Sequence, residues 1–489
     1  MIHLTSVDLK KVKAETLVIP VCQDKQIHDD ATIATLVRIA KRLKEFKGEK
    51  GDQISLYNLP DVKTLRVVFM GLGKLEKVDM EALRATAGKA VMEAIKKDLS
   101  NMLIAVPAAA ALNMEIQGVL ESMMEGACLG NHLFDKYKKE KKHKPLKKIH
   151  LLVSADAIKN YRKLSDRIET VCQGTILARE WVSTPPNDKK PEQFSNSIAQ
   201  LARKENLKVT VWGEKELKQK NFGAILAVAA GSRNRPRMVI LEHHPKKTAN
   251  TIVLVGKGVT FDSGGINLKP SGSLEDMKLD MSGAAAVAAT LISLARLKSK
   301  ASVVGIIPVV ENMPSGDASR PGDIINSFAG KTVEIGNTDA EGRLILIDAI
   351  AYGVKRYKPR ILIDLATLTG ACVVALGEKI AGLFSFDDKL AEDIFLSGAK
   401  THERCWRMPL PEDYKELLKS DFADLNNMSS TRYGGAITAA LFLSEFIGET
   451  RWAHIDIAGP AYTKKETAYC GAGGTGFGVR LLCDLLEKL

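Results

Sequence analysis

The sequence predicts an α/β protein in which a small N-terminal α/β domain is joined by a helix to a larger α/β domain with a central mixed sheet. Short β-rich apolar runs alternate with helical periodicity along the chain. Its 489 residues exceed what one simple core accommodates, which indicates at least two domains. A double proline, Pro185-Pro186, ends a long helical segment and gives a rigid entry into a part richer in glycine.

The first domain is expected to cover residues 1–165. Strands are predicted at 17–21, 65–70 and 102–106, and helices at about 80–97 and 114–138. No group of His, Asp, Glu or Cys stands there at ligand spacing. We therefore expect this domain to serve assembly, with regulation as a further role.

The second domain is expected to cover residues 166–489, and a long helix at about 157–182 leads into it. Continuous apolar runs at 251–255, 302–309 and 360–365 predict fully buried strands of a mixed or parallel sheet. The alanine-rich segment 283–297 predicts a tightly packed helix between two of these strands.

Composition is that of a soluble globular protein, with 45% hydrophobic and 26% charged residues. No apolar run approaches the roughly 20 residues that span a bilayer, so no membrane association is expected. The N-terminus lacks the pattern of a secretory signal. Seven scattered cysteines without a C-x-x-C pair are typical of reduced thiols, which predicts a cytoplasmic location.

The net charge of +12 is partly concentrated in the lysine-rich stretch Lys136–Lys148. One interpretation is a surface that contacts the phosphates of nucleic acid. The other is a solvated helix end followed by a loop, and it is favoured because no series of stacking aromatics accompanies the lysines.

Residues 337–344, Asn-Thr-Asp-Ala-Glu-Gly-Arg-Leu, place a charged residue at every second position. In an extended chain Asp339, Glu341 and Arg343 would point to the same side. Two carboxylates that close repel each other unless a cation lies between them, which suggests a metal ion. A polar turn or strand edge is the simpler alternative.

A second informative segment, 255–265, leaves a predicted buried strand and enters a glycine-rich loop. Such loops commonly bind ligands in open α/β sheets, although the spacing of a phosphate-binding loop is absent. Lys257 and Asp262 lie in this segment, Lys269 follows, and Asp280 precedes the alanine-rich helix. Asp280 alone would be a plain helix cap. Together, two carboxylates and two lysines within 24 residues indicate a site.

Segments 255–265, 280–283 and 337–344 resemble the signatures of the cytosolic leucyl aminopeptidase family, the di-metal peptidases of the M17 type. The octapeptide matches without a departure. Segments 183–187, 364–370 and 473–476 resemble the family as well. The likeness covers about residues 170–489 and is looser over the first 165.

The resemblance implies a metal-dependent aminopeptidase that hydrolyses the N-terminal bond of peptides with a free α-amine, with a preference for leucine and other apolar residues. Asp262 and Glu341 would bridge two divalent ions that activate a water molecule. Asp339 would complete one metal site, and Lys257 and Asp280 the other. Lys269 would stabilise the tetrahedral intermediate, and Arg343 would hold bicarbonate as the general base.

Oxygen-rich ligation suits Mn²⁺ or Mg²⁺ and accepts Zn²⁺. Lysine binds a metal only as the neutral amine, a form that a neighbouring dication favours. The resemblance further implies a homohexamer that acts on short peptides, and a first side-chain pocket lined by Met277, Thr367 and Ala458. A different di-metal hydrolase, such as a phosphoesterase, is the remaining alternative.

Overall fold

The computed structural model describes residues 2–244 and 250–489. The chain forms two compact units. The first comprises Met1–Cys172 and Lys465–Ala472, and the second comprises Gln173–Lys464 and Gly473–Leu489. The long helix α5 (Ala155–Ser183) contributes residues to both.

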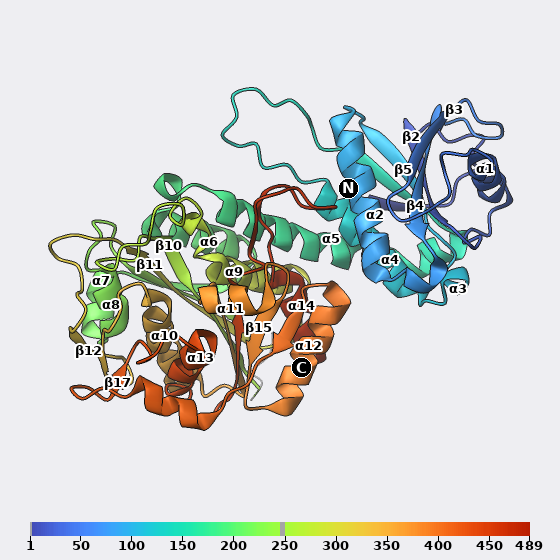
Figure 1. The fold of residues 1–489 in the computed structure, drawn as a ribbon. Coiled ribbons are helices and arrows are strands. Elements are labelled where there is room, and N and C mark those ends of the chain that lie inside the picture. Colours follow the sequence, from blue (N-terminus) through green and yellow to red (C-terminus); the bar gives the residue numbers. More distant parts are fainter. Residues whose placement is uncertain (1, 245–249) are drawn as a thin grey trace. The chain divides into compact units, whose positions relative to one another are not determined.

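The first unit contains a six-stranded sheet in the order β1-β6-β5-β2-β4-β3 (Figure 1). These strands are β1 (Ile2–Thr5), β6 (Lys148–Leu152), β5 (Asn101–Ala105), β2 (Thr16–Cys22), β4 (Arg66–Gly73) and β3 (Gln53–Tyr57). Only the edge strand β3 runs antiparallel to its neighbour. The strands predicted at 17–21, 65–70 and 102–106 are therefore confirmed.

The helices of this unit are α1 (Ala31–Lys41), α2 (Met80–Lys96), α3 (Ala109–Leu112) and α4 (Ile116–Gly130). Gly88 of α2 and Gly126 of α4 let these helices pack closely. A β-carbon at Gly126 would lie 2.0 Å from the carbonyl oxygen of Arg84, and one at Gly88 would lie 3.0 Å from the carbonyl oxygen of Gly126. The inserted segment 465–472 lies against α2, where the hydroxyl of Tyr469 donates to Glu81 over 2.9 Å.

The helix predicted at 114–138 is too long at its C-terminal end, because α4 stops at Gly130. The side chain of Asn131 pairs with the backbone of Leu146, donating over 3.0 Å and accepting over 2.7 Å. This pairing closes residues 132–145 into a loop, so most of the lysines of the basic stretch lie in an exposed loop.

The second unit contains a nine-stranded mixed sheet in the order β16-β15-β18-β14-β9-β11-β8-β7, with β10 paired to β11. The strands are β7 (Lys208–Trp212), β8 (Arg237–His243), β9 (Ile252–Gly256), β10 (Gly258–Asp262), β11 (Val303–Asn312), β14 (Ile361–Ala366), β15 (Ala381–Phe384), β16 (Cys405–Arg407) and β18 (Arg451–Asp456). The central strands β11, β9, β14 and β18 run parallel to one another. Strand β8 is antiparallel to both β11 and β7, and β15 is antiparallel to β18 but parallel to β16. The predicted fold class is confirmed.

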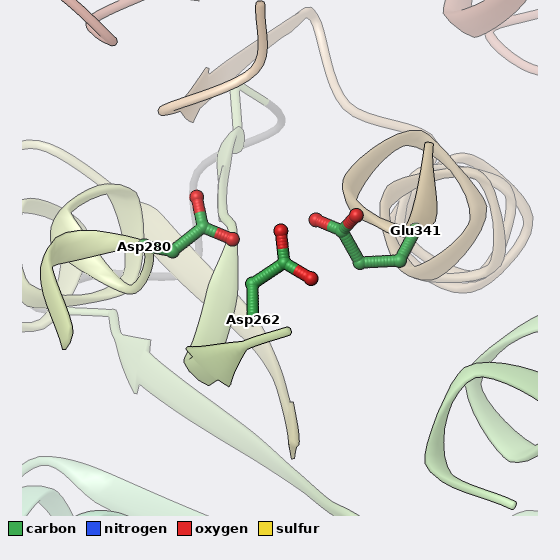
Figure 2. Close-up of side chains that lie close together, drawn as sticks. All are labelled: Asp262, Asp280 and Glu341. Atoms are coloured by element: carbon green, nitrogen blue, oxygen red, sulfur yellow. The ribbon is translucent and has the colours of Figure 1, made fainter. Parts of the chain in front are cut away.

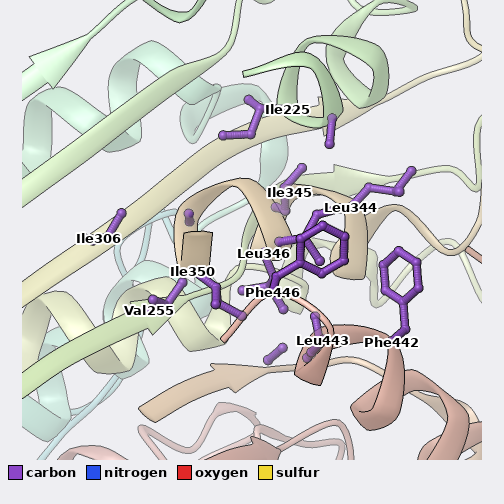
Figure 3. Close-up of a cluster of buried hydrophobic side chains, with 14 of the residues drawn as sticks. Ile225, Val255, Ile306, Leu344, Ile345, Leu346, Ile350, Phe442, Leu443 and Phe446 are labelled. Carbon is purple, nitrogen blue, oxygen red and sulfur yellow. The ribbon is translucent and has the colours of Figure 1, made fainter. Parts of the chain in front are cut away.

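Helices cover both faces of this sheet. Helices α8 (Gly223–Ala229), α10 (Glu341–Tyr357) and α13 (Gly435–Ser444) share one apolar cluster with Val253, Val255 and Ile306, part of which Figure 3 shows. Helix α9 (Ser282–Arg296) contacts the same strands but contributes nothing to that cluster, so it covers the opposite face. The remaining elements are α6 (Pro191–Lys204), α7 (Glu214–Gln219), α11 (Gly370–Leu376), α12 (Asp388–Thr401), α14 (Val479–Lys488), β12 (Ile324–Asn326), β13 (Thr332–Glu334), β17 (Leu425–Asn426), β19 (Tyr462–Thr463), β20 (Gly473–Gly474) and four short 3₁₀ turns.

The stretch Met277–Arg296 is the one segment of the described residues that is long and apolar enough to cross a membrane. Polar residues interrupt this stretch, so it does not form one continuous apolar run in the sequence. In the fold 83% of its apolar window is buried inside the protein. It is therefore accounted for as a core helix.

Candidate metal centre

The predicted site residues gather where the parallel strands of the second unit end. Lys257 follows β9, Asp262 ends β10, and Thr367 follows β14. Ligands commonly bind in the crevice at the carboxyl ends of strands in open α/β sheets. The fold therefore places this cluster at the usual position for a site.

Three buried carboxylates form the centre of the cluster. Each of Asp262, Asp280 and Glu341 offers an oxygen within 4.8 Å of the oxygens offered by the other two. Figure 2 shows Asp262 at the end of a strand, Asp280 from the loop before a helix, and Glu341 from the first turn of another helix, all directed toward one space. At most 4% of each residue is exposed.

Lys257 lies among these carboxylates and is itself buried. Its Nζ lies 2.7 Å from Oδ1 of Asp280 and 2.8 Å from Oε1 of Glu341, and it donates to the carbonyl of Thr367 over 2.9 Å. Burial opposes its charge, but the surrounding carboxylates outweigh burial and raise the pKa of Lys257.

Lys269 links the cluster to Asp339. Its Nζ lies 2.7 Å from Oδ2 of Asp262 and 2.5 Å from Oδ1 of Asp339. Asp339 lies at the rim, with 34% of its side chain exposed. Desolvation opposes the charge of Lys269 as well, but Asp262 and Glu341 raise its pKa overall.

Residues 337–344 do not form the extended segment considered from the sequence. The side chain of Asn337 accepts from the backbone N–H of Asp339 over 2.8 Å, which makes a turn, and Glu341 begins α10. Glu341 and Arg343 therefore reach the site from the first helical turn, and Asp339 from the preceding turn. The three side chains therefore approach one site from a turn and a helix, and not from alternate positions of a β-strand.

Asp280 is not the helix cap suggested as its simplest role. Met281 occupies the N-cap position of α9, and no side chain caps that end. Oδ1 of Asp280 instead contacts Lys257 and accepts from the hydroxyl of Thr367 over 2.7 Å.

Arg343 is buried beside the carboxylates. Its Nη1 donates to the carbonyl of Asn427 over 2.7 Å, whereas its Nε has no hydrogen-bond partner among the described residues. Burial lowers the pKa of Arg343 to about 10, so the guanidinium stays charged at neutral pH.

The charges of the cluster fit a divalent cation. Burial raises the pKa of Asp262, Asp280 and Asp339, and the neighbouring carboxylates raise it further. The four carboxylates of the cluster outnumber its two lysines. Oδ2 of Asp280 and Oε2 of Glu341 are buried without a hydrogen-bond partner in the described part of the chain. Buried polar atoms are ordinarily paired, so these two oxygens are available to bind cations.

Two supporting residues were not predicted from the sequence. Asn312 donates from Nδ2 to Asp262 over 2.8 Å and to the carbonyl of Thr338 over 3.1 Å, so it ties the two acidic segments together. Its position at the end of the buried strand β11 marks it as a candidate site residue, but the sequence does not show which segments it joins. For the carbonyl of Asn427, which holds Arg343, the sequence offers no comparable signal.

Comparison with known proteins agrees with this geometry. Residues 176–483 match the catalytic domain of the cytosol aminopeptidase family, and residues 18–141 match the N-terminal domain of the same family. A probable cytosol aminopeptidase of Chlorobium limicola is 41% identical and aligns with 100% of this chain and 99% of its own length. One from Desulfovibrio desulfuricans is 42% identical and covers 97% of this chain and 96% of its own.

Solved structures show the same fold. A bottromycin maturation enzyme in complex with Mn superposes with a TM-score of 0.87 at 33% identity, over 97% of this chain and 99% of that one. A mutant of tomato leucine aminopeptidase also gives a TM-score of 0.87, at 30% identity, over 100% of this chain and 96% of that one. The chain therefore belongs to the cytosol aminopeptidase family of metal-dependent peptidases, and its activity is that of an aminopeptidase.

Proposed function

We propose that the enzyme removes leucine and other apolar residues from the N-termini of short peptides, using two divalent cations held by Lys257, Asp262, Asp280, Asp339 and Glu341. The observation that carries this proposal is the convergence of Asp262, Asp280 and Glu341 around a space bordered by two unpartnered carboxylate oxygens. Manganese is the first candidate because one structural relative is described in complex with Mn. Zinc and magnesium are the others.

Two divalent cations in such a site would acidify a water molecule and polarise the scissile carbonyl. Asp262 and Glu341 are proposed to bridge them, because both carboxylates are directed toward the same space (Figure 2). Lys257 has to give up a proton before its amine can act as a ligand. Because metal binding releases protons, cation affinity is expected to rise with pH.

Lys269 is proposed to stay protonated and to stabilise the negative charge that develops on the carbonyl oxygen. Its ammonium group is held by Asp262 and Asp339, so it is oriented before the reaction begins. A fixed cation of this kind favours the transition state over the uncharged peptide.

Arg343 is proposed to hold a bicarbonate ion that serves as general base and carries the proton to the leaving amine. A guanidinium that stays charged at neutral pH does not act as the base itself. Its unpartnered Nε and its planar shape suit a planar oxyanion bound through two hydrogen bonds.

The preference for leucine is proposed to arise from a pocket formed by Met277, Thr367 and Ala458. The segments that carry Met277 and Thr367 meet at Asp280, to which the hydroxyl of Thr367 donates. The segment that carries Met277 also contacts the chain that follows Ala458, because Lys464 pairs with Asp276 over 2.8 Å. Met277 and Ala458 are half-buried, as lining residues of an open pocket would be.

Residues 1–165 are proposed to serve assembly into a homohexamer and residues 166–489 to serve catalysis. A cytoplasmic location is proposed because the curated relatives are named cytosol aminopeptidases. The comparisons give no support to a nucleic-acid-binding role for the basic stretch Lys136–Lys148, since both matched domains are those of an aminopeptidase family.

The test compares leucine amide, N-acetyl-leucine amide and p-nitrophenyl phosphate as substrates of the Mn²⁺-loaded protein. The proposal expects turnover of the first alone, because a free α-amine is required. Equal turnover of the acetylated substrate, or preferential turnover of the phosphate ester, would instead support another di-metal hydrolase. Alanine and glycine amides measure the side-chain preference.

A further inference from the structure

Asp456 is a buried carboxylate at the end of β18 that the metal centre does not use. Its exposed fraction is 1%. Oδ1 accepts from the backbone N–H groups of Leu368 and Ala458, each over 3.1 Å, and Oδ2 accepts from the hydroxyl of Thr369 over 2.7 Å. One side chain therefore binds two loops that leave neighbouring strands.

These two loops carry two of the three proposed pocket residues. Strands β14 and β18 pair in parallel, and Ala366 lies opposite Asp456 at their carboxyl ends. Thr367 and Leu368 follow directly after β14, and Ala458 follows two residues after Asp456. The carboxylate of Asp456 thus fixes the distance between the Thr367 side and the Ala458 side of the pocket.

The first of these loops also reaches the proposed metal ligands. The carbonyl of Thr367 accepts from Lys257, and its hydroxyl donates to Asp280. A displacement of Leu368 would be transmitted through one peptide unit to Thr367. The position of the pocket wall and that of the ligands are therefore coupled through this residue.

We propose that Asp456 is a positioning residue that sets the width of the side-chain pocket and thereby the selectivity for the N-terminal residue of the substrate. The proposal rests on the function proposed above, since it assumes that Thr367 and Ala458 line this pocket.

A carboxylate serves this role better than an amide. The hydroxyl of Thr369 already accepts from the backbone N–H of Cys372 over 3.0 Å, so its own proton is free to go to Asp456. Asparagine can keep the two backbone N–H bonds on its oxygen. Its NH₂ group, however, would face a hydroxyl that needs an acceptor. Asp456→Asn should therefore retain most of the loop geometry, and Asp456→Ala should lose it.

Asp348 provides a matched control in the same unit. It is fully buried and also accepts three hydrogen bonds, from the backbone N–H groups of Ala224, Ile225 and Phe328. None of these bonds reaches Leu368, Ala458 or Thr369. Asp348→Ala should thus lower the stability of the fold, as the loss of a buried carboxylate does, without a change at the pocket.

The experiment measures kcat and KM for leucine, alanine and glycine amides with the Mn²⁺-loaded full-length wild type, Asp456→Ala, Asp456→Asn and Asp348→Ala. We expect the leucine-to-glycine ratio of kcat/KM to fall roughly tenfold or more in Asp456→Ala, the range that imperfect filling of an apolar pocket produces. Asp456→Asn should lower the ratio by a smaller factor, because only the bond from the Thr369 hydroxyl is lost, and Asp348→Ala should leave it unchanged.

A uniform loss over the three substrates, or an equal change of the ratio in Asp348→Ala, would overturn the proposal. If Asp456→Ala fails to fold, Asp456→Asn decides alone: a reduced leucine-to-glycine ratio supports the proposal and an unchanged ratio refutes it. Failure of the proposed function is a separate result, because the wild type itself would then not hydrolyse leucine amide.

Discussion

Lys257 and Gly342 approach each other so closely that a β-carbon at position 342 would lie 2.4 Å from Cε of Lys257 and 2.7 Å from its Nζ. Gly342 stands between Glu341 and Arg343 in the first turn of α10. The absence of a side chain there lets the lysine amine reach Asp280 and Glu341. The glycine of the octapeptide is thus part of the site, although it bears no functional group.

Gly342→Ala should leave the fold intact and impair the site. The atoms in the way are the flexible end of Lys257, and alanine favours a helix over glycine by about 0.5–1 kcal/mol. We expect the urea midpoint to stay or rise while Mn²⁺ affinity and turnover both fall. Gly316→Ala, which places its β-carbon in open space, is the control. Wild-type affinity and turnover in Gly342→Ala would show that Lys257 does not need its observed position.

Glu341→Ala should lose metal together with activity. The variant removes both a proposed bridging oxygen and an ion-pair partner of Lys257. Metal content after dialysis, measured by mass spectrometry, is expected to fall from two ions per chain to one or fewer. Two ions retained per chain would rule out the bridging role.

Arg343→Ala should separate metal binding from rate. Its guanidinium contacts the carbonyl of Asn427, and no ion pair joins it to the carboxylates among the described residues. Metal content should match that of the wild type, while kcat falls by about 10²–10⁴, the range for loss of a general base. Added bicarbonate should stimulate the wild type and leave the variant unaffected. Stimulation of both would argue against Arg343 as the bicarbonate site.

Asp348 should make stability depend on pH. Burial raises its pKa to about 7, from an ordinary value near 3.8, even though three backbone N–H groups donate to it. Between these two pH values the folded protein keeps a proton that the unfolded chain releases. Stability from this group is therefore full below about pH 4 and is lost as pH rises to about 7, by up to about 4 kcal/mol.

The measurement is the urea midpoint at pH 5 and pH 8 for the wild type and Asp348→Asn, which carries no titratable group at this position. The wild type should lose more stability, or gain less, than the variant between these pH values. The same pH dependence in both proteins would show that Asp348 does not titrate there.

The sequence predicted the buried strands well because their apolar runs are continuous and rich in β-branched residues, as in β9 and β14. It left residues 337–344 open between extended chain and a turn, and the side chain of Asn337 forms the turn. The turn brings Asp339 to Lys269, and the alternation of side chains along a β-strand does not predict this contact.

Contacts between distant parts of the chain were beyond sequence reasoning. The carbonyl of Thr367 binds Lys257 across 110 residues, and Asn312 binds Asp262 across 50. Backbone carbonyls carry no sequence signal, and an asparagine at a strand end has many roles. Asp456 escaped notice for the same reason, since two of its three partners are backbone N–H groups, and Leu368 and Thr369 lie on another loop.

The central claim is that the Asp262, Asp280 and Glu341 cluster holds the divalent cations on which peptide hydrolysis depends. The most direct test is leucine amide hydrolysis by one preparation before chelation, after exhaustive chelation, and after Mn²⁺ is returned, with metal content measured at each stage. We predict that activity is lost with the metal and returns in proportion to it, up to two ions per chain. Undiminished activity in the metal-free protein would contradict the claim.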